Sequence, residues 1–115
     1  MAITFETSNP SNLLSTFKRL IAARHVQTWS CDADGDFTHT PDQWRNKAFL
    51  RPSVQSGRLV FTMLGNTRVV TTWEIYAVYQ GRFIEAMISH CHDSFSTAAA
   101  TANPSTSDQL TSRVA

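Results

Sequence analysis

The sequence predicts an α+β protein with an N-terminal helix, a four-stranded antiparallel sheet of two hairpins and a long C-terminal helix, packed in two layers. Three observations predict it. Apolar residues recur every three to four positions near both ends of the chain, they alternate with polar residues in the middle, and turn-forming residues separate the alternating runs. With 115 residues, of which 42% are hydrophobic, the chain has the size and composition of a single folded domain.

We expect this domain to occupy residues 1–95. Residues 96–115 contain mostly Ser, Thr, Ala, Asn, Pro and Asp with almost no large apolar side chain, which is typical of a mobile tail. Within the domain, residues 1–8 are interpreted as a lead-in to the first helix. Asn9-Pro10-Ser11 is typical of a helix start, because Pro is tolerated in the first turn and Asn or Ser can cap it.

The first helix is predicted to end near Val26. Its apolar stripe has helical spacing, with Lys18 and Arg19 between the apolar positions, and comprises Leu13, Leu14, Phe17, Leu20 and Ile21. From Gln27 onward the period changes to two, because Trp29 and Cys31 alternate with polar neighbours. The sequence therefore predicts that strands begin here.

The first hairpin is predicted around the segment Asp32-Ala-Asp-Gly-Asp36, which separates Cys31 from Phe37. Asp-Gly readily adopts the positive φ angles that tight hairpin turns require. Pro41 then ends the second strand, because it has no N–H to donate to a sheet.

A second hairpin is predicted from residues 49–54 and 58–64, joined by a turn at 55–57 that contains Gly57. In its second strand Leu59, Phe61 and Met63 would share one face. Pro52 indicates an edge position or a bulge in its first strand. Gly65-Asn66 would end the pair.

Residues 67–72 are compatible with a linker or with an extra strand. The second helix is predicted over residues 73–91, with Thr71 or Thr72 as its cap and Glu74 in its first turn. Gly81 in its interior costs about 1 kcal/mol relative to Ala and suggests a close contact there. A rival interpretation is a third hairpin that turns at Gln80-Gly81. The predicted buried stripe comprises Ile75, Tyr76, Tyr79, Phe83, Met87, Cys91 and Phe95.

Two patterns resemble metal sites and depart from them. Asp32, Asp34 and Asp36 match the first three ligand positions of a calcium loop, yet Phe37 replaces the required glycine and Gln43 replaces the final glutamate. His90 and His92 lie about 200° apart on a helix, so they do not share a face. We predict a polar turn and no metal or cofactor.

Other classes of chemistry have little support in the sequence. There is no Gly-x-Ser-x-Gly motif, and with four glycines the chain lacks a phosphate-binding loop. Cys31 and Cys91 are predicted to be buried free thiols. A net charge of +1 argues against nucleic-acid binding, although residues 44–47 and 49–51 combine basic and aromatic side chains. The N-terminus has no signal-peptide pattern and the apolar stretch 73–95 is interrupted by charges, so we expect a cytoplasmic protein without membrane association.

The candidate ligand-binding residues lie in the first hairpin and in the second helix. Glu85 is a carboxylate in an otherwise apolar segment, and burial beside other polar groups would shift its pKa and mark a pocket. The predicted set, in which no residue is assigned a catalytic role, is Asp34, Asp36, His39, Arg82, Glu85 and His90.

Three segments, 34–44, 79–85 and Ser89-His90, resemble those of small uncharacterised bacterial proteins. They read Asp-Gly-Asp-Phe-Thr-His-Thr-Pro-Asp-Gln-Trp, Tyr-Gln-Gly-Arg-Phe-Ile-Glu and Ser-His. The resemblance would cover most of residues 12–105. It implies a shared fold and carries no activity that could be transferred.

The function that the sequence favours is a non-catalytic binding or assembly module that forms a homodimer. Aromatic residues are abundant for a core of this size, a glycine interrupts an apolar segment, and no catalytic set converges in the sequence. An exposed apolar face would require a partner. The alternative is an enzyme, or a protein that binds a metal or small ligand between the first hairpin and the second helix.

Overall fold

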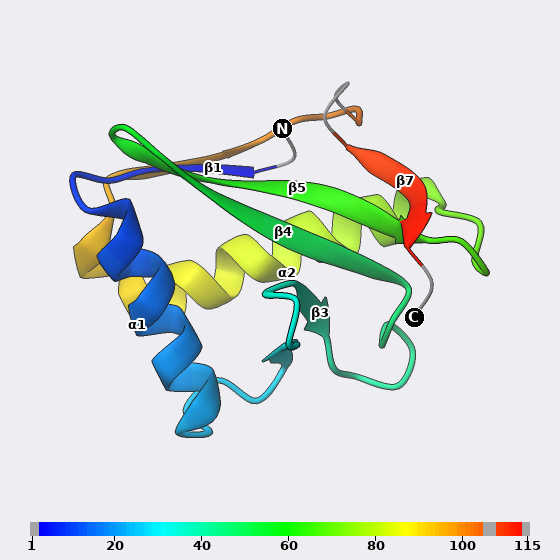
Figure 1. Ribbon diagram of the computed structural model, residues 1–115, viewed down its shortest axis with the longest axis horizontal. Coiled ribbons are helices and arrows are strands. Elements are labelled where there is room, and N and C mark those ends of the chain that lie inside the picture. The colour runs from blue at the N-terminus through cyan, green and yellow to red at the C-terminus, as the bar shows by residue number, and fades with distance from the viewer. Residues whose placement is uncertain (1–2, 105–107, 114–115) are drawn as a thin grey trace.

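The computed structural model of the protein describes residues 3–104 and 108–113. Its α+β class agrees with the prediction (Figure 1). The elements are β1 (Ile3–Glu6), α1 (Pro10–Ala22), β2 (Trp29–Cys31), β3 (Phe37–His39), β4 (Ala48–Gln55), β5 (Arg58–Asn66), α2 (Trp73–Cys91), the 3-10 turn η1 (His92–Ser94), β6 (Thr97–Ala100) and β7 (Gln109–Arg113).

Residues 3–104 and 108–113 form a sheet of seven strands, so the prediction of four was too small. Six strands are antiparallel in the order β2-β3-β4-β5-β1-β6, and β7 pairs in parallel with β5. The additional strands are β1, in the predicted lead-in, and β6 and β7, in the segment predicted as a tail. They form because β5 provides an edge for β1 and β7, and β1 in turn provides one for β6.

Both predicted hairpins are present. In the first, Cys31 pairs with Phe37 across the aspartate-rich turn. In the second, β4 and β5 pair along their whole length around a turn in which Gly57 has a φ of 76°. Gly65 and Asn66 were expected to end this hairpin, but they continue β5.

Helix α1 begins where the sequence predicts and ends four residues earlier than Val26. The side chain of Asn9 accepts a hydrogen bond of 3.1 Å from the backbone N–H of Asn12, and Pro10 occupies the first turn. The helix ends at Ala22 because Arg24 takes a φ of 63°, in the left-handed region that stops an α-helix.

Helix α2 forms over residues 73–91, so the rival third hairpin is wrong. The Thr72 hydroxyl accepts a hydrogen bond from the N–H of Ile75 at 3.2 Å and caps the helix. Gly81 is exposed, and a Cβ built at this position would meet no heavy atom of the described residues within 4 Å. Residues 67–72 form a turn and an extended linker rather than a strand.

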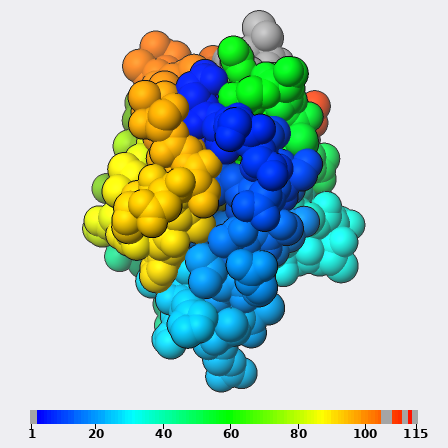
Figure 2. Space-filling view, turned by 90° about the vertical axis from the view of Figure 1, so that its left-hand side faces the viewer, coloured from blue at the N-terminus to red at the C-terminus, as the bar shows by residue number. Residues whose placement is uncertain are grey.

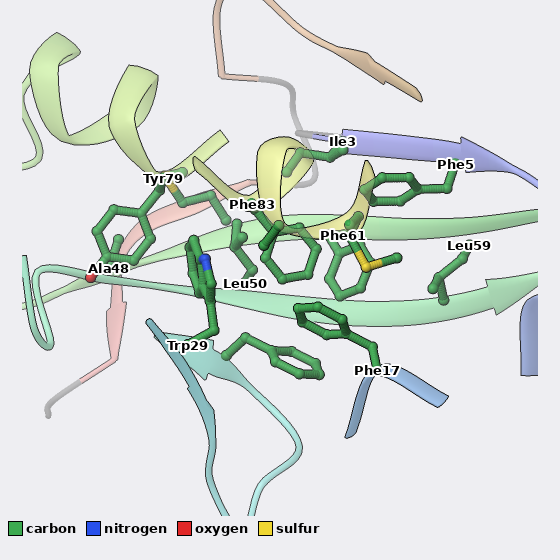
Figure 3. Packing of buried hydrophobic residues seen from close by; sticks show 14 of the residues in the cluster. Ile3, Phe5, Phe17, Trp29, Ala48, Leu50, Leu59, Phe61, Tyr79 and Phe83 are labelled. Carbon is green, nitrogen blue, oxygen red and sulfur yellow. The ribbon is translucent and has the colours of Figure 1, made fainter. Parts of the chain in front are cut away.

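The core lies between the sheet and both helices. Leu59, Phe61 and Met63 contribute to it together, as their alternation in β5 predicts. Phe83 of α2 lies among aromatic rings, with its centroid 4.6 Å from that of Phe61 and 4.9 Å from that of Trp29 (Figure 3). Helix α1 and the C-terminal end of α2 lie side by side at one end of the molecule (Figure 2). The helices therefore bury one shared face of the sheet.

Candidate functional site

The turn between β2 and β3 is held by its first aspartate. The Asp32 carboxylate accepts hydrogen bonds from the backbone N–H groups of Asp34 and Asp36, both at 3.0 Å. Gly35 has a φ of 85°, a conformation that is strained for residues with a Cβ. The Asp-Gly sequence thus makes the predicted tight turn. We call Asp32, Asp34 and Asp36 the acidic hairpin.

Asp36 is the buried member of the acidic hairpin, with a side chain that is 0% exposed. Its two carboxylate oxygens each accept a hydrogen bond of 2.8 Å from the Arg51 guanidinium, and Arg113 also donates to it. The hydrogen bond to Asp36 raises the pKa of Arg51 above its usual value. A buried carboxylate is stable only with such partners, so these two arginines account for its burial.

Arg113, at the end of β7, contacts all three carboxylates of the acidic hairpin. Its Nη2 lies 2.6 Å from an Asp32 oxygen and 3.6 Å from an Asp34 oxygen, and its guanidinium lies 4.0 Å above the centroid of the Phe49 ring. Partial burial acts to raise the pKa of Asp32, but hydrogen bonds from the Asp36 and Asp34 backbone and from Arg113 outweigh it and lower this pKa. The acidic hairpin therefore binds an arginine of the same chain.

Arg113 was missed in the sequence analysis because it was assigned to a tail. It lies 77 positions after Asp36, and no local pattern links residues so far apart. The only signal in the sequence was the arginine itself. Apart from Asp108, Arg113 is the one charged residue in the segment 96–115.

His39, the next residue of the predicted set, is buried at the opposite end of β3 from Asp36. Its Nδ1 donates to the Thr28 carbonyl at 2.7 Å, because a carbonyl oxygen can only accept, and its ring lies 4.6 Å from that of Trp29, centroid to centroid. Burial lowers the pKa of His39, with the Thr28 hydrogen bond acting against it. The neutral ring is therefore favoured in the folded protein.

The three remaining residues of the predicted set are on α2. Arg82 and Glu85 form an exposed ion pair at 3.6 Å, and His90 is exposed near the end of the helix. The hollow beside Arg82 and Glu85 is lined otherwise only by Ala77, Val78 and Gly81. Thus the structure brings Asp34 and Asp36 together and pairs Arg82 with Glu85, but these groups do not line one common hollow.

In the part of the chain that the structure describes, no group of three or more His, Cys, Asp or Glu side chains is arranged to hold a metal ion.

None of the helices formed by residues 3–104 and 108–113 combines the length and the apolar character that a membrane-spanning helix needs.

An apolar surface lies where β5 leads into α2. Val70 is 83% exposed and Trp73 is 65% exposed, and two adjoining hollows of about 440 and 410 Å³ open beside them. The Trp73 ring is T-shaped to that of Tyr76, with centroids 6.2 Å apart. We call this the Trp73 surface, and it consists of Val69, Val70, Trp73, Tyr76 and Leu110.

Two charged residues flank the Trp73 surface. Arg68 precedes Val69 in the linker, and Glu74 follows Trp73 in the helix, and both are exposed. Neither forms an ion pair with any residue that the structure describes. The sequence analysis did not select this surface, although Trp73 lies outside the buried stripe of α2 and could have indicated it.

Comparisons of the chain with protein-family models, with curated proteins and with solved structures give no match. The acidic hairpin and the Trp73 surface are the two features on which a function can be argued. The first is filled by Arg113, and the second is open.

Proposed function

We propose that the protein is a non-catalytic assembly module that forms a homodimer through the Trp73 surface. The observation that carries this proposal is the exposure of Trp73, at 65%, next to Val70, at 83%. A large apolar side chain beside hollows is the usual composition of an interface centre, where Trp is the most enriched residue. Val54 and Ile88, the other exposed large hydrophobic residues, lie on β4 and elsewhere on α2.

Charge favours a second copy of the chain as the partner. In a two-fold dimer the same patch lies on both sides, so a residue on one flank faces the opposite flank of the other copy. Arg68 and Glu74, which carry opposite charges, lie at the two ends of the segment that carries Val69, Val70 and Trp73, and neither forms an ion pair with a described residue. Each would therefore meet its opposite charge across a two-fold axis.

Catalysis or small-ligand binding is the weaker proposal. His39, Arg82 and Glu85 are the best candidates for it, because both charges act on the pKa of the His39 ring. However, Arg82 and Glu85 already neutralise each other, and their hollow of about 300 Å³ is lined without His39. No other observation favours this second class.

The test of the dimer is the solution mass across a concentration series, by sedimentation or light scattering. We expect twice the chain mass of 12.9 kDa. Trp73→Ala should weaken dimerisation at least about thirtyfold, because truncation of a central interface aromatic costs about 2 kcal/mol or more. Ile88→Ala is the matched control, since it removes an exposed apolar side chain of α2 outside the surface.

The two-fold arrangement has its own test. Arg68→Glu and Glu74→Arg should each weaken the dimer by placing like charges opposite each other, and the double variant should restore it. A wild-type chain that stays monomeric, or a dimer that Trp73→Ala leaves unchanged, would contradict the proposed function. A dimer that depends on Trp73 but shows no rescue in the double variant would contradict only the pairing of Arg68 with Glu74.

A further inference from the structure

Strand β7 differs from every other strand of the sheet. Among the described strands it alone is parallel to its neighbour, and, like β2 and β6, it pairs with a single strand. Its register is irregular, because the pairs Leu64 with Gln109 and Asn66 with Arg113 advance by two residues on β5 and by four on β7. Regular ladder hydrogen bonds therefore hold β7 less than they hold the antiparallel strands.

Contacts at the two ends of β7 compensate for this irregular pairing. At one end the Asp108 carboxylate accepts a hydrogen bond of 2.8 Å from the N–H of Met63. At the other end Arg113 binds the acidic hairpin and lies over Phe49, and its carbonyl accepts a hydrogen bond of 2.5 Å from the N–H of Thr67. The cation at position 113 is therefore a side-chain anchor at the C-terminal end of this strand.

The middle of β7 connects this anchor to the Trp73 surface. Leu110 lines both hollows beside Trp73 and Val70. Its carbonyl accepts a hydrogen bond of 3.1 Å from the Thr71 hydroxyl and passes so close to Gly65 that a Cβ there would lie 1.4 Å from the oxygen. Glycine is thus required at position 65, because any larger residue would collide with the Leu110 carbonyl.

We infer that β7 is a strap that completes the Trp73 surface, and that Arg113, held by the acidic hairpin, is the positioning residue that keeps the strap in place. This inference rests on the proposed function, because it concerns the same dimer surface. When the strap is docked, Leu110 forms a wall of both hollows. When it is released, that wall is lost and the surface no longer matches its copy.

The inference also explains the acidic hairpin. Three carboxylates at one turn repel one another unless a cation lies among them. Arg51 binds Asp36, and Arg113 is the cation that contacts all three carboxylates. Arg113 comes from the strand that carries Leu110 only three positions earlier. The hairpin therefore acts on the dimer surface through β7 without touching a partner itself.

Two variants release the strap by different means. Gly65→Ala makes a methyl group collide with the Leu110 carbonyl. The φ of Gly65 is outside the left-handed region, so the backbone at this position is compatible with alanine. Arg113→Gln keeps a long polar side chain but removes the charge. Gly81→Ala is the matched control, because it adds the same methyl group where no heavy atom of the described residues outside the adjoining helix backbone lies within 4 Å.

Release of the strap is measured separately from dimerisation. Hydrogen exchange of the Met63 and Thr67 amides, which donate to Asp108 and Arg113, reports the docking of β7 at concentrations where the chain is monomeric. The dimer dissociation constant is then measured by sedimentation. We expect Gly65→Ala and Arg113→Gln each to lower protection of both amides and to weaken the dimer by about tenfold or more, and Gly81→Ala to change neither.

The outcomes separate the strap from the dimer. If the Met63 and Thr67 amides lose protection and the dimer dissociation constant is unchanged, the inference is overturned and the proposed dimer is not affected. Retained protection in Arg113→Gln overturns the role of Arg113 as the anchor, and this variant decides the matter if Gly65→Ala does not fold. A wild-type chain that is monomeric at every concentration overturns the proposed function, and the strap's role in the dimer with it.

Discussion

The aromatic core and the corner where β7 docks are stabilised in different ways. In the core, Phe83 has ring contacts with five other aromatic residues, and the burial of apolar surface is non-directional. At the corner, Asp36, Arg51 and Arg113 each depend on specific partners at fixed distances. Core side chains can therefore repack after a small change in volume, whereas each substitution at the corner removes a specific hydrogen bond or ion pair.

The largest effect is expected from Phe83→Ala in the core. Removal of a fully buried ring that contacts five others leaves a cavity and should lower the free energy of unfolding by about 4 kcal/mol. Urea unfolding followed by fluorescence measures this change. Phe95→Ala is the matched control, because this ring is only half-buried and contacts Phe5 alone among the aromatic residues. An equal loss in the two variants would contradict a core centred on Phe83.

Asp36→Asn should have the next largest effect and tests the corner. It removes the charge that both arginines share and should cost about 3 kcal/mol, below the highest values for buried pairs because Arg51 is 49% exposed and can reach water. Asp34→Asn is the control, since Asp34 is exposed and lies 3.6 Å from Arg113, and exposed pairs contribute about 1 kcal/mol or less. Similar losses of unfolding free energy in the two variants would show that the burial of Asp36 does not determine the size of the effect.

Gly81→Ala lies outside both regions and should stabilise the protein by about 0.5 to 1 kcal/mol. Alanine restricts the unfolded chain and favours the helix, and the added methyl group meets no neighbouring atom of the described residues. Thermal unfolding measures the gain. A loss of stability would mean that Gly81 has a contact outside the single chain, such as one in a dimer.

The smallest effect is the pH dependence that His39 confers at the edge of the core. Burial lowers the pKa of His39 below 6.5, so the unfolded state binds the proton more tightly than the folded state. The contribution to stability is complete above pH 6.5 and is lost as the pH falls through the lowered folded pKa. Urea unfolding between about pH 7.5 and about pH 5 measures the slope. His39→Gln should flatten this slope, and an unchanged slope would assign it to another group.

Local patterns in the sequence were sufficient to predict both helices and both hairpins. The caps at Asn9 and Thr72 and the alternation in β5 act over a few residues, so the sequence displays them directly. The Asp-Gly turn was also predicted from two neighbouring residues. For the candidate site, the same local reasoning selected Asp34 and Asp36 as important but could not identify their partner.

The other strands depend on contacts that are distant in the sequence. In β6, Thr-Ala-Ala-Ala has no apolar alternation of its own and forms a strand because β1 offers an edge. β7 depends on Gly65 and on the acidic hairpin, both of which lie more than forty positions earlier. The Trp73 surface was missed because the apolar stripe was used only to predict which residues of α2 are buried, and Trp73, an apolar residue outside that stripe, was not considered as a surface residue.

The position of β1 between β5 and β6 has a consequence for the kinetics of folding. Ile3 pairs with Phe61 on one side and with Ala100 on the other, so β1 is completed only by strands that lie much later in the chain. Closing such long loops is slow, and proteins dominated by distant pairings fold in about milliseconds to seconds. Until then Ile3 and Phe5, which are buried in the folded protein, have no sheet partner, so the chain exposes apolar side chains that promote association between molecules.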